Sequence, residues 1–320
     1  MRVLIVGCGY VGMRLALELA SQGHQVSGLR RSAPGQPGTE TALLPIGSGE
    51  GESRGLAPGL LAADITRPAE LAKISPEYDW VVNCVSSSRG GAEDYRKTYL
   101  EGTRNLIDWL SPRPPGKFVY TSSTSVYGQT DGSLVTEASP AEPATESARI
   151  LLNTEKVLLE AASEFPAVIL RVAGIYGPGR GHWFKQYLNN EAIIEGRGKR
   201  ILNMVHRDDA AGAIIAALEG AGPGKIYNVV DDEPVTQLAY FEWLAARLAK
   251  SLPPFAAAEE APERKRGLTS KKVSNSRLKL ELGYQFKYPT FRQGYAAEID
   301  RLNQRGPMGD DSNRPEKKSA

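Results

Sequence analysis

The sequence has little cysteine and no long hydrophobic run. Cys8 and Cys84 are the only cysteines in 320 residues, too few for a disulfide framework, and this favours a reducing compartment. No uninterrupted apolar stretch approaches the roughly 18 residues that a membrane-spanning helix requires. The apolar N-terminal stretch runs directly into glycines and lacks a small-residue cleavage site, so it does not resemble a signal peptide. We therefore expect a cytoplasmic protein with no membrane partner.

The sequence also lacks an excess of charge of either sign. Lysine and arginine number 39 and aspartate and glutamate 37, so the net charge of +2 provides no general attraction to nucleic acid. Hydrophobic residues make up 41% of the chain and charged residues 24%, which is typical of a soluble globular protein. The three histidines and two cysteines form no cluster with metal-ligand spacing, so we expect no metal site.

A glycine-rich turn stands between an apolar strand and a helix near the N-terminus. Residues 2–6 predict a buried strand, and small or apolar residues recur at helical spacing from Leu15 onward. The intervening Gly-x-Gly-x-x-Gly allows a tight turn, close approach of a pyrophosphate to the backbone, and close packing of the helix on its strand. The helix N-terminus then offers free N–H groups to phosphates. We predict a dinucleotide bound by Gly7, Gly9, Tyr10, Val11 and Gly12.

The residues after the second predicted strand, 25–29, bear on the choice of dinucleotide. At this point an acid binds the ribose 2′-hydroxyl of NAD, whereas arginine accommodates the 2′-phosphate of NADP. The chain has Arg30, Arg31 and Ser32 there, and no acid before Glu40. Because a guanidinium binds phosphate through paired hydrogen bonds, we predict NADP, with NAD as the alternative. A solvated basic turn is the other interpretation of these arginines.

Strands and helices alternate as far as Val172. Further strands are predicted at 60–63, 80–85, 117–121 and 167–172, with helices at 69–74, 93–110 and 147–163. This alternation predicts an α/β fold with a Rossmann-type doubly wound parallel sheet. Ligands of such sheets bind at the carboxyl ends of the strands. Asp64, the small residues from Ser86 onward, and Ser122 with Ser123 all stand at such ends.

The regular alternation stops after Val172. We predict a dinucleotide-binding domain over residues 1–172 and a smaller C-terminal substrate lobe over 173–304, with elements that pack back on the first domain. Helices are expected at 183–194, 210–218 and 238–250, and a strand at 226–230. Residues 33–59 are interpreted as a loop and the polar residues 305–320 as a disordered tail. The basic stretch 264–279 is interpreted as a solvated face.

Seven short segments identify a family resemblance. They are residues 7–12, 64–65, 101–106, 121–128, 171–178, 206–209 and 227–234. In this order they resemble the atypical and extended short-chain dehydrogenase/reductase superfamily, in its NAD-dependent epimerase/dehydratase branch. The resemblance implies that Asp64 and Ile65 lie beside the adenine and that Ser123 matches the catalytic serine. Cys84, Val85 and Ser86 are expected to lie along the nicotinamide ribose.

The catalytic pattern departs from this family. Its members use Tyr-x-x-x-Lys on the helix after the serine loop, where the lysine lowers the phenol pKa for proton exchange. With Glu155 as the anchor, the tyrosine position is Ser147 and the lysine position is Leu151. Neither residue can perform the usual role.

Three explanations stay open. The first is an active oxidoreductase or epimerase/dehydratase-like enzyme with a relocated acid, for which the candidates are Tyr127, Tyr176, Glu146 and His206. The second is a non-catalytic NADP(H)-binding redox sensor or regulator, for which the Cys8–Cys84 pair would be a thiol switch. The third is a scaffold with a vestigial pocket, which the intact glycine turn disfavours.

We predict an NADP(H)-binding enzyme that acts on a small polar substrate, of which a nucleotide sugar is one example. Ser123 would hold the substrate oxygen, and Tyr127 is the nearest tyrosine in sequence. A homodimer formed by helices 93–110 and 147–163 is implied only by the resemblance.

Overall fold

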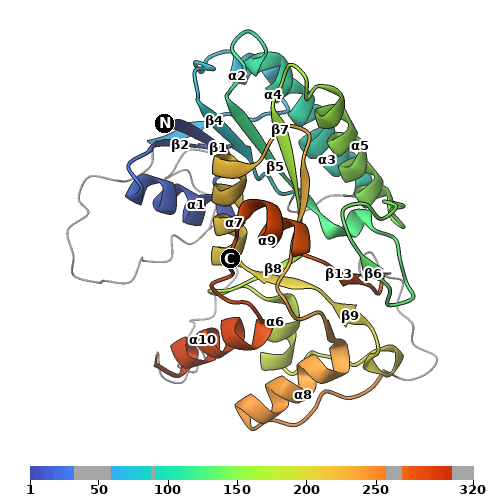
Figure 1. The fold of residues 1–320 in the computed structure, drawn as a ribbon. Helices are drawn as coiled ribbons and strands as arrows, with labels where there is room; N and C mark the ends of the chain where they lie inside the picture. The colour runs from blue at the N-terminus through green and yellow to red at the C-terminus, as the bar shows by residue number, and fades with distance from the viewer. Residues whose placement is uncertain (32–58, 88–90, 257–268, 305–320) are drawn as a thin grey trace, which may run out of the picture.

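The computed structural model describes residues 1–31, 59–87, 91–256 and 269–304, which form a twisted parallel sheet covered by helices and a smaller layer beneath it (Figure 1). Ser32, nearly all of the predicted loop 33–59, part of the basic stretch and the tail 305–320 lie outside the described residues.

The central sheet has seven parallel strands in the order β3-β2-β1-β4-β5-β7-β11. Chain order reverses between β1 and β4, which is the point where doubly wound sheets bind their ligands. The predicted fold class is therefore confirmed. The strands are β1 (Arg2–Val6), β2 (Gln25–Arg30), β3 (Gly59–Ala62), β4 (Trp80–Asn83), β5 (Lys117–Ser123), β7 (Ala167–Val172) and β11 (Ile226–Val229).

Alternate strand residues pack into two cores, one on each face of the sheet. Val3 and Ile5 of β1 pack toward α1 (Tyr10–Ser21), α7 (Arg207–Gly220) and α9 (Ser276–Leu282), whereas Leu4 and Val6 face the opposite core. That second core is built by α2 (Pro68–Leu71), α4 (Gly102–Leu110) and α5 (Glu146–Glu160). Burial on both faces explains why the strands are almost continuously apolar.

The helix predicted at 93–110 contains a wider turn. It begins as α3 (Ala92–Tyr95), continues as the π-helical segment η1 (Arg96–Glu101) and ends as α4. Gly102 is the first residue of α4, directly after η1, and a Cβ there would lie 2.6 Å from Cδ1 of Ile65. The glycine thus lets the helix lie directly against the residue expected beside the adenine.

A third core lies below the sheet. Most of its aromatic residues, which include Phe184, Tyr240 and Phe291, come from α6 (His182–Leu188), α8 (Gln237–Leu248) and α10 (Phe291–Gln304). The predicted helix 183–194 ends early, at Leu188, because Asn190 adopts a left-handed conformation with φ of 60°. The remaining elements are short: β6 (Leu134–Val135) with β13 (Lys272–Val273), β8 (Gly174–Tyr176) with β10 (Met204–His206), β9 (Ile201–Leu202) with β12 (Val235–Thr236), η2 (Thr124–Val126) and η3 (Gly196–Gly198).

Part of the chain beyond residue 172 returns to the sheet. β11 pairs with β7, and α7 packs against α1. This is the packing that the proposed division into 1–172 and 173–304 requires, while the boundary itself stays a prediction.

Candidate cofactor and substrate site

The glycine turn has the geometry of a phosphate cradle. Gly7 has a φ of +85°, and a Cβ on it would lie 2.6 Å from the Val85 backbone, so only glycine fits. A Cβ on Gly12 would lie 2.8 Å from the carbonyl oxygen of Gly7. At Gly9, by contrast, the nearest atom would be 3.8 Å away. Gly7 and Gly12 are therefore required by the fold, whereas Gly9 leaves open space for a ligand.

The N-terminus of α1 is free to bind an anion. Gly9 is its N-cap, no side chain caps it, and its first turn contains no acid. Tyr10, Val11 and Gly12 are the first three residues of the helix, so their N–H groups have no acceptor within it. The positive end of the helix dipole and these donors suit a pyrophosphate, as predicted for the glycine turn.

Arg30 lies at the carboxyl end of β2, next to β1 in the sheet. Its side chain is half-buried, whereas Arg31 is exposed. Burial raises the pKa of Cys8 to about 11, and the nearby charge of Arg30 opposes that shift. The guanidinium of Arg30 is thus close to the glycine turn, on the side where a ribose attached to the pyrophosphate would lie.

Asp64 and Ile65 follow β3 at the same edge of the sheet. Oδ1 of Asp64 accepts hydrogen bonds from the backbone N–H (2.9 Å) and hydroxyl (2.8 Å) of Thr66, which fixes the carboxylate. The side chain of Asn105 donates to the backbone oxygen of Ile65 at 2.8 Å. The turn is rigid, and its role beside an adenine stays a prediction.

The residues after β4 form the wall next to the glycine turn. Cys84 donates its thiol to the carbonyl of Gly7 at 3.4 Å, and Val85 contacts Gly7 directly. Ser86 is exposed. Burial raises the pKa of Cys84 to about 12, with a further contribution from Cys8. Both thiols therefore stay protonated near neutral pH, which disfavours a thiol switch.

Ser122 and Ser123 end β5 but have different surroundings. Ser122 is buried, and its hydroxyl donates to Oε1 of Glu155 at 2.5 Å. Ser123 is half-buried, and its Oγ accepts the N–H of Ser125 at 3.2 Å. Of the two serines, only Ser123 retains a hydroxyl proton with no acceptor among the described residues, so it is the better candidate to hold a substrate oxygen.

Tyr127 is part of a buried network rather than the cleft surface. Its side chain is 0% exposed, and its hydroxyl donates to Asn228 at 2.8 Å and accepts from Arg171 at 2.9 Å. Burial raises the pKa of Tyr127 above its usual value, although the charge and hydrogen bond of Arg171 act to lower it. The geometry therefore does not support the predicted catalytic role of Tyr127, because its hydroxyl is inaccessible and already bonded.

This network was not recognised in the sequence. Arg171 of β7 forms a buried ion pair with Glu155 of α5 at 2.7 Å, and Glu155 also holds Ser122. Arg171 and Glu155 are 16 positions apart. The sequence pointed to Arg171 only as part of a family segment and to Glu155 only as the anchor of the dyad positions, and it did not predict that the two residues pair. The network ties β5, α5 and β7 together directly behind the serine loop.

The two dyad positions lie on α5, whose sequence contains no tyrosine. Ser147 is half-buried in its first turn, and Leu151 is buried in the second core, between α5 and the sheet. Leu151 thus contributes to packing, and a lysine there would place its charge among apolar side chains.

The other candidate acids are not exposed to a shared cleft either. Tyr176 is buried, which raises its pKa strongly, and it stacks on Tyr295. His206 caps α7, accepting the N–H of Asp208 through Nδ1 at 3.2 Å. Glu146 is exposed and pairs with Arg149 at 2.9 Å. Tyr176 and His206 are therefore engaged elsewhere, Glu146 is next to Ser147 but paired with Arg149, and the proton donor is unassigned.

The basic stretch is not the uniformly solvated face that the sequence predicts. Lys271 is 4% exposed, and its Nζ donates to the backbone oxygen of Tyr127 at 2.7 Å. Burial lowers its pKa to about 8, assisted by the charge of Arg200. Lys272 is exposed, as predicted.

The described residues offer neither a metal site nor a membrane span. No group of three or more His, Cys, Asp or Glu residues in that part of the chain could hold a metal ion. Within the same ranges, no helix has the length and apolar character needed to cross a membrane.

A doubly wound parallel sheet with a glycine turn at its switch point is the architecture typical of dinucleotide-binding proteins. The profile of the NAD-dependent epimerase/dehydratase family matches residues 3–229, and the chain belongs to that family. Protein YeeZ of Escherichia coli K12 is 30% identical over 293 residues, covering 90% of this chain and 96% of that protein. A 3-diazoavenalumate denitrifying reductase from Streptomyces is 25% identical over 324 residues, covering 93% and 100%.

Solved structures show the same architecture. A putative NAD-dependent epimerase/dehydratase from Methylobacillus flagellatus is 33% identical, with a TM-score of 0.72 over 94% of this chain and 98% of that chain. The dTDP-glucose 4,6-dehydratase DesIV from Streptomyces venezuelae, solved with NAD, has a TM-score of 0.79 over 95% and 97% at 22% identity, which is a likeness of fold alone.

Proposed function

We propose that this protein is an NADP(H)-dependent oxidoreductase that acts on a small polar substrate without a tyrosine–lysine dyad. The observation that carries the proposal is the cradle of Gly7, Gly9 and Gly12 before the uncapped N-terminus of α1. Gly9 leaves space that no fold contact requires, and that space suits a pyrophosphate. Tyr10 and Val11 would supply the backbone donors.

The preference for NADP rests on Arg30 and Arg31. A half-buried guanidinium at the end of β2 matches a 2′-phosphate better than a neutral hydroxyl. Solved neighbours are described with NAD, and NAD is therefore the alternative cofactor. Asp64 and Ile65 would contact the adenine, and Cys84, Val85 and Ser86 would line the nicotinamide ribose.

When bound, the cofactor supplies or accepts a hydride. Ser123 would hold the oxygen of the substrate, while water from the open side of the cleft would supply the proton that α5 cannot. Epimerisation and dehydration demand a well-placed base as well as hydride transfer, so the missing dyad favours simple reduction. The Streptomyces relative that is named a reductase supports the same direction.

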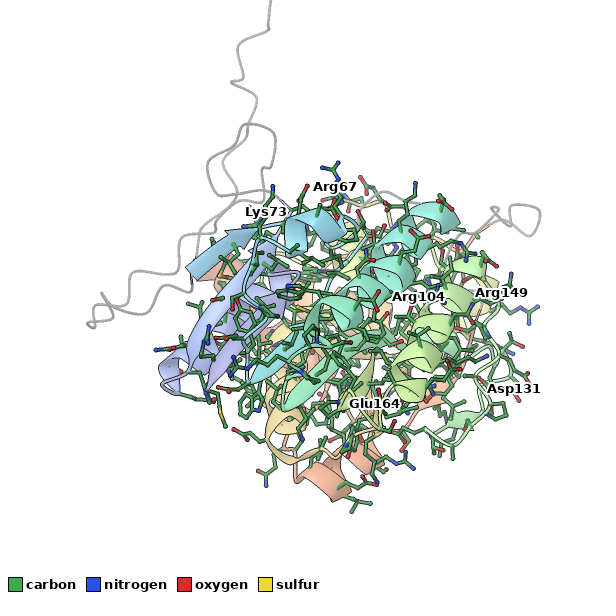
Figure 2. All side chains as sticks on the ribbon, turned by 90° about the horizontal axis from the view of Figure 1, so that it is seen from above. Arg67, Lys73, Arg104, Asp131, Arg149 and Glu164 are labelled. Atoms are coloured by element: carbon green, nitrogen blue, oxygen red, sulfur yellow. The ribbon has the colours of Figure 1, made fainter. Side chains whose placement is uncertain are left out.

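The substrate is proposed only as a class. It would be a small polar molecule with a hydroxyl or keto carbon whose oxygen Ser123 could hold, and a nucleotide sugar is one example. The cytoplasmic location and the homodimer also stay predictions. The dimer would use the helices at 93–110 and 147–163, and Arg149 of α5 lies at the outer margin of the molecule (Figure 2).

The activity test follows NADPH oxidation by the full-length protein across panels of carbonyl compounds and nucleotide sugars. We expect turnover with at least one panel member and none with the Gly9→Val variant, in which the cradle is filled. Tight NADPH binding without turnover on either panel would refute the enzyme proposal.

Calorimetry tests the cofactor choice. Combining Arg30→Asp with Arg31→Ala should weaken NADPH binding by about 2 kcal/mol, on the scale of lost charge-assisted hydrogen bonds, and leave NADH binding nearly unchanged. Equal affinity of the parent protein for the two cofactors would contradict the assignment.

A non-catalytic NADP(H)-binding regulator is the second candidate. The observation in its favour is the substrate side of the site, where Tyr127 is buried and Leu151 belongs to the core. This candidate predicts submicromolar NADPH binding and a change of protein conformation on binding, with no consumption of NADPH.

A further inference from the structure

A turn from the second lobe reaches the phosphate cradle. The hydroxyl of Tyr10, the first residue of α1, donates to the backbone oxygen of Pro178 at 3.1 Å. Pro178 belongs to a glycine-rich turn closed by reciprocal backbone hydrogen bonds of 2.9 Å between Gly177 and Arg180. A Cβ on Gly177 would lie 3.0 Å from the Tyr10 hydroxyl, so the turn packs closely on the tyrosine.

This turn places the side chain of Arg180 over Tyr10. The guanidinium carbon is 5.0 Å from the centre of the Tyr10 ring. A ring stacked under a guanidinium restricts its movement without using its N–H donors. Arg180 is therefore positioned within one side chain of the helix N-terminus that receives the pyrophosphate, with its hydrogen-bonding capacity intact.

The neighbouring arginine makes the contrast clear. Arg207 also lies over Tyr10, at 5.2 Å, but its guanidinium forms an ion pair with Asp208 at 3.0 Å. For Arg180, which is exposed, no carboxylate in the described parts of the chain lies within ion-pair distance. Of the two cations at the cradle, Arg180 is the one whose charge no acid of the described chain neutralises.

We propose that Arg180 binds the pyrophosphate of the dinucleotide and closes the cradle from the second lobe. The proposal rests on the proposed function, because it requires a dinucleotide on α1. A pyrophosphate carries two negative charges, of which the α1 N-terminus meets only part. A guanidinium that offers paired donors would complete the site.

The proposal separates two sets of arginines by the phosphate that they recognise. Arg30 and Arg31 would contact the 2′-phosphate, which only NADP(H) carries, whereas Arg180 would contact the pyrophosphate of both cofactors. ADP-ribose has the pyrophosphate without the 2′-phosphate, and 2′-AMP has the 2′-phosphate without the pyrophosphate. These two probes therefore report on the two sets separately.

The test is calorimetry on the full-length protein with NADPH, NADH, ADP-ribose and 2′-AMP. Arg180→Ala should weaken NADPH, NADH and ADP-ribose about tenfold each and leave 2′-AMP within twofold. Arg180→Glu should weaken the same three further, and Arg180→Lys should recover part of the loss. Arg247→Ala, which removes an exposed arginine of α8 whose ion pair with Asp300 is also exposed, is the matched control and should change none of the four.

Two outcomes overturn the proposal, and they are distinguishable. If the parent binds ADP-ribose and NADPH but Arg180→Ala and Arg180→Glu bind them within twofold of the parent, Arg180 has no role and the proposed function stands. If the parent binds none of the dinucleotides, both fail. The thermal midpoint of each variant without ligand should match that of the parent. Among the described residues the Arg180 side chain forms no hydrogen bond or ion pair, and the backbone bonds between Arg180 and Gly177 do not depend on it.

Discussion

The two ends of the candidate site depend on different groups, backbone atoms at one end and side chains at the other. Around β1, β2 and β4, the backbone shapes the space for a ligand. Gly7 and Gly12 leave no room for a Cβ, and the N-terminus of α1 offers free N–H groups. Around β5 and α5, the corresponding chemistry depends on side chains, and there the family tyrosine and lysine positions hold Ser147 and Leu151.

The difference shows how a catalytic centre can change while its cofactor site persists. A side chain on α5 can be replaced by a leucine that joins the core, and the helix gains packing rather than losing it. A residue other than glycine at position 7 would strain the backbone and clash with Val85. The cofactor end is therefore locked to the fold, and the substrate end is free to diverge.

The largest effect is expected at the framework behind the substrate end. Glu155→Gln leaves the buried Arg171 without its counter-charge and should lower the free energy of unfolding by about 3–5 kcal/mol. Glu160→Gln, an exposed change on the same helix, should stay within about 0.5 kcal/mol of the parent. Urea unfolding measures both.

If the two ends are independent, the Glu155→Gln protein should still bind NADPH within about threefold of the parent, under conditions where it is folded. A loss of NADPH binding that parallels the loss of stability would mean that the glycine turn depends on the same framework.

A pH-dependent effect of intermediate size is expected at Asp231, away from the glycine turn. Burial raises the pKa of Asp231, after β11, to about 8. Between its unfolded value near 4 and this pH, the folded state holds a proton that the unfolded chain releases, so stability is lost as pH rises through this window. Asp231→Asn cannot ionise at this position. Its free energy of unfolding relative to that of the parent should therefore rise by about 3 kcal/mol between pH 5 and pH 8.

Unfolding in urea at pH 5 and pH 8 measures this difference. The matched control is Asp232→Asn, the adjacent and less buried aspartate, which pairs with Lys279 at 3.0 Å and should lose a little stability at both pH values. A pH-independent difference between Asp231→Asn and the parent would show that Asp231 is ionised in the folded protein.

The smallest effect on stability and the most specific effect on binding are expected at Gly9. A Cβ there meets no atom within 3.4 Å, so Gly9→Ala should fold with an unchanged thermal midpoint. It should lose about 30-fold in NADPH affinity, or about 2 kcal/mol, because the methyl group occupies the approach of the pyrophosphate. Gly222→Ala, at an open position far from the cradle, should affect neither. Unchanged NADPH binding by Gly9→Ala would place the dinucleotide elsewhere.

The same division decides what could be predicted from the sequence. The glycine spacing, the apolar strands and their alternation with helices are local patterns, and they were sufficient for the sheet and its class. The particular pairing of β11 with β7 and the burial of Tyr127 depend on contacts between distant segments, such as Tyr127 with Arg171 and Asn228. The end of α6 at Leu188 depends instead on the local left-handed backbone of Asn190.

Side-chain roles were harder to predict for the same reason. Lys271 lies in a run of basic residues and was interpreted as solvated, yet its amine is buried against the backbone of Tyr127, 144 positions earlier. The contact of Arg180 with Tyr10 likewise joins two turns that no sequence spacing relates.

The central claim is that the backbone cradle and Arg30 select NADP(H). Its most direct test is calorimetric titration of the full-length protein with NADPH and NADH under the same buffer conditions. We predict that NADPH binds at least tenfold more tightly, and that the Arg30→Asp, Arg31→Ala variant loses this difference while retaining NADH binding. Equal affinities in the parent protein, or no binding of either cofactor, would contradict the account.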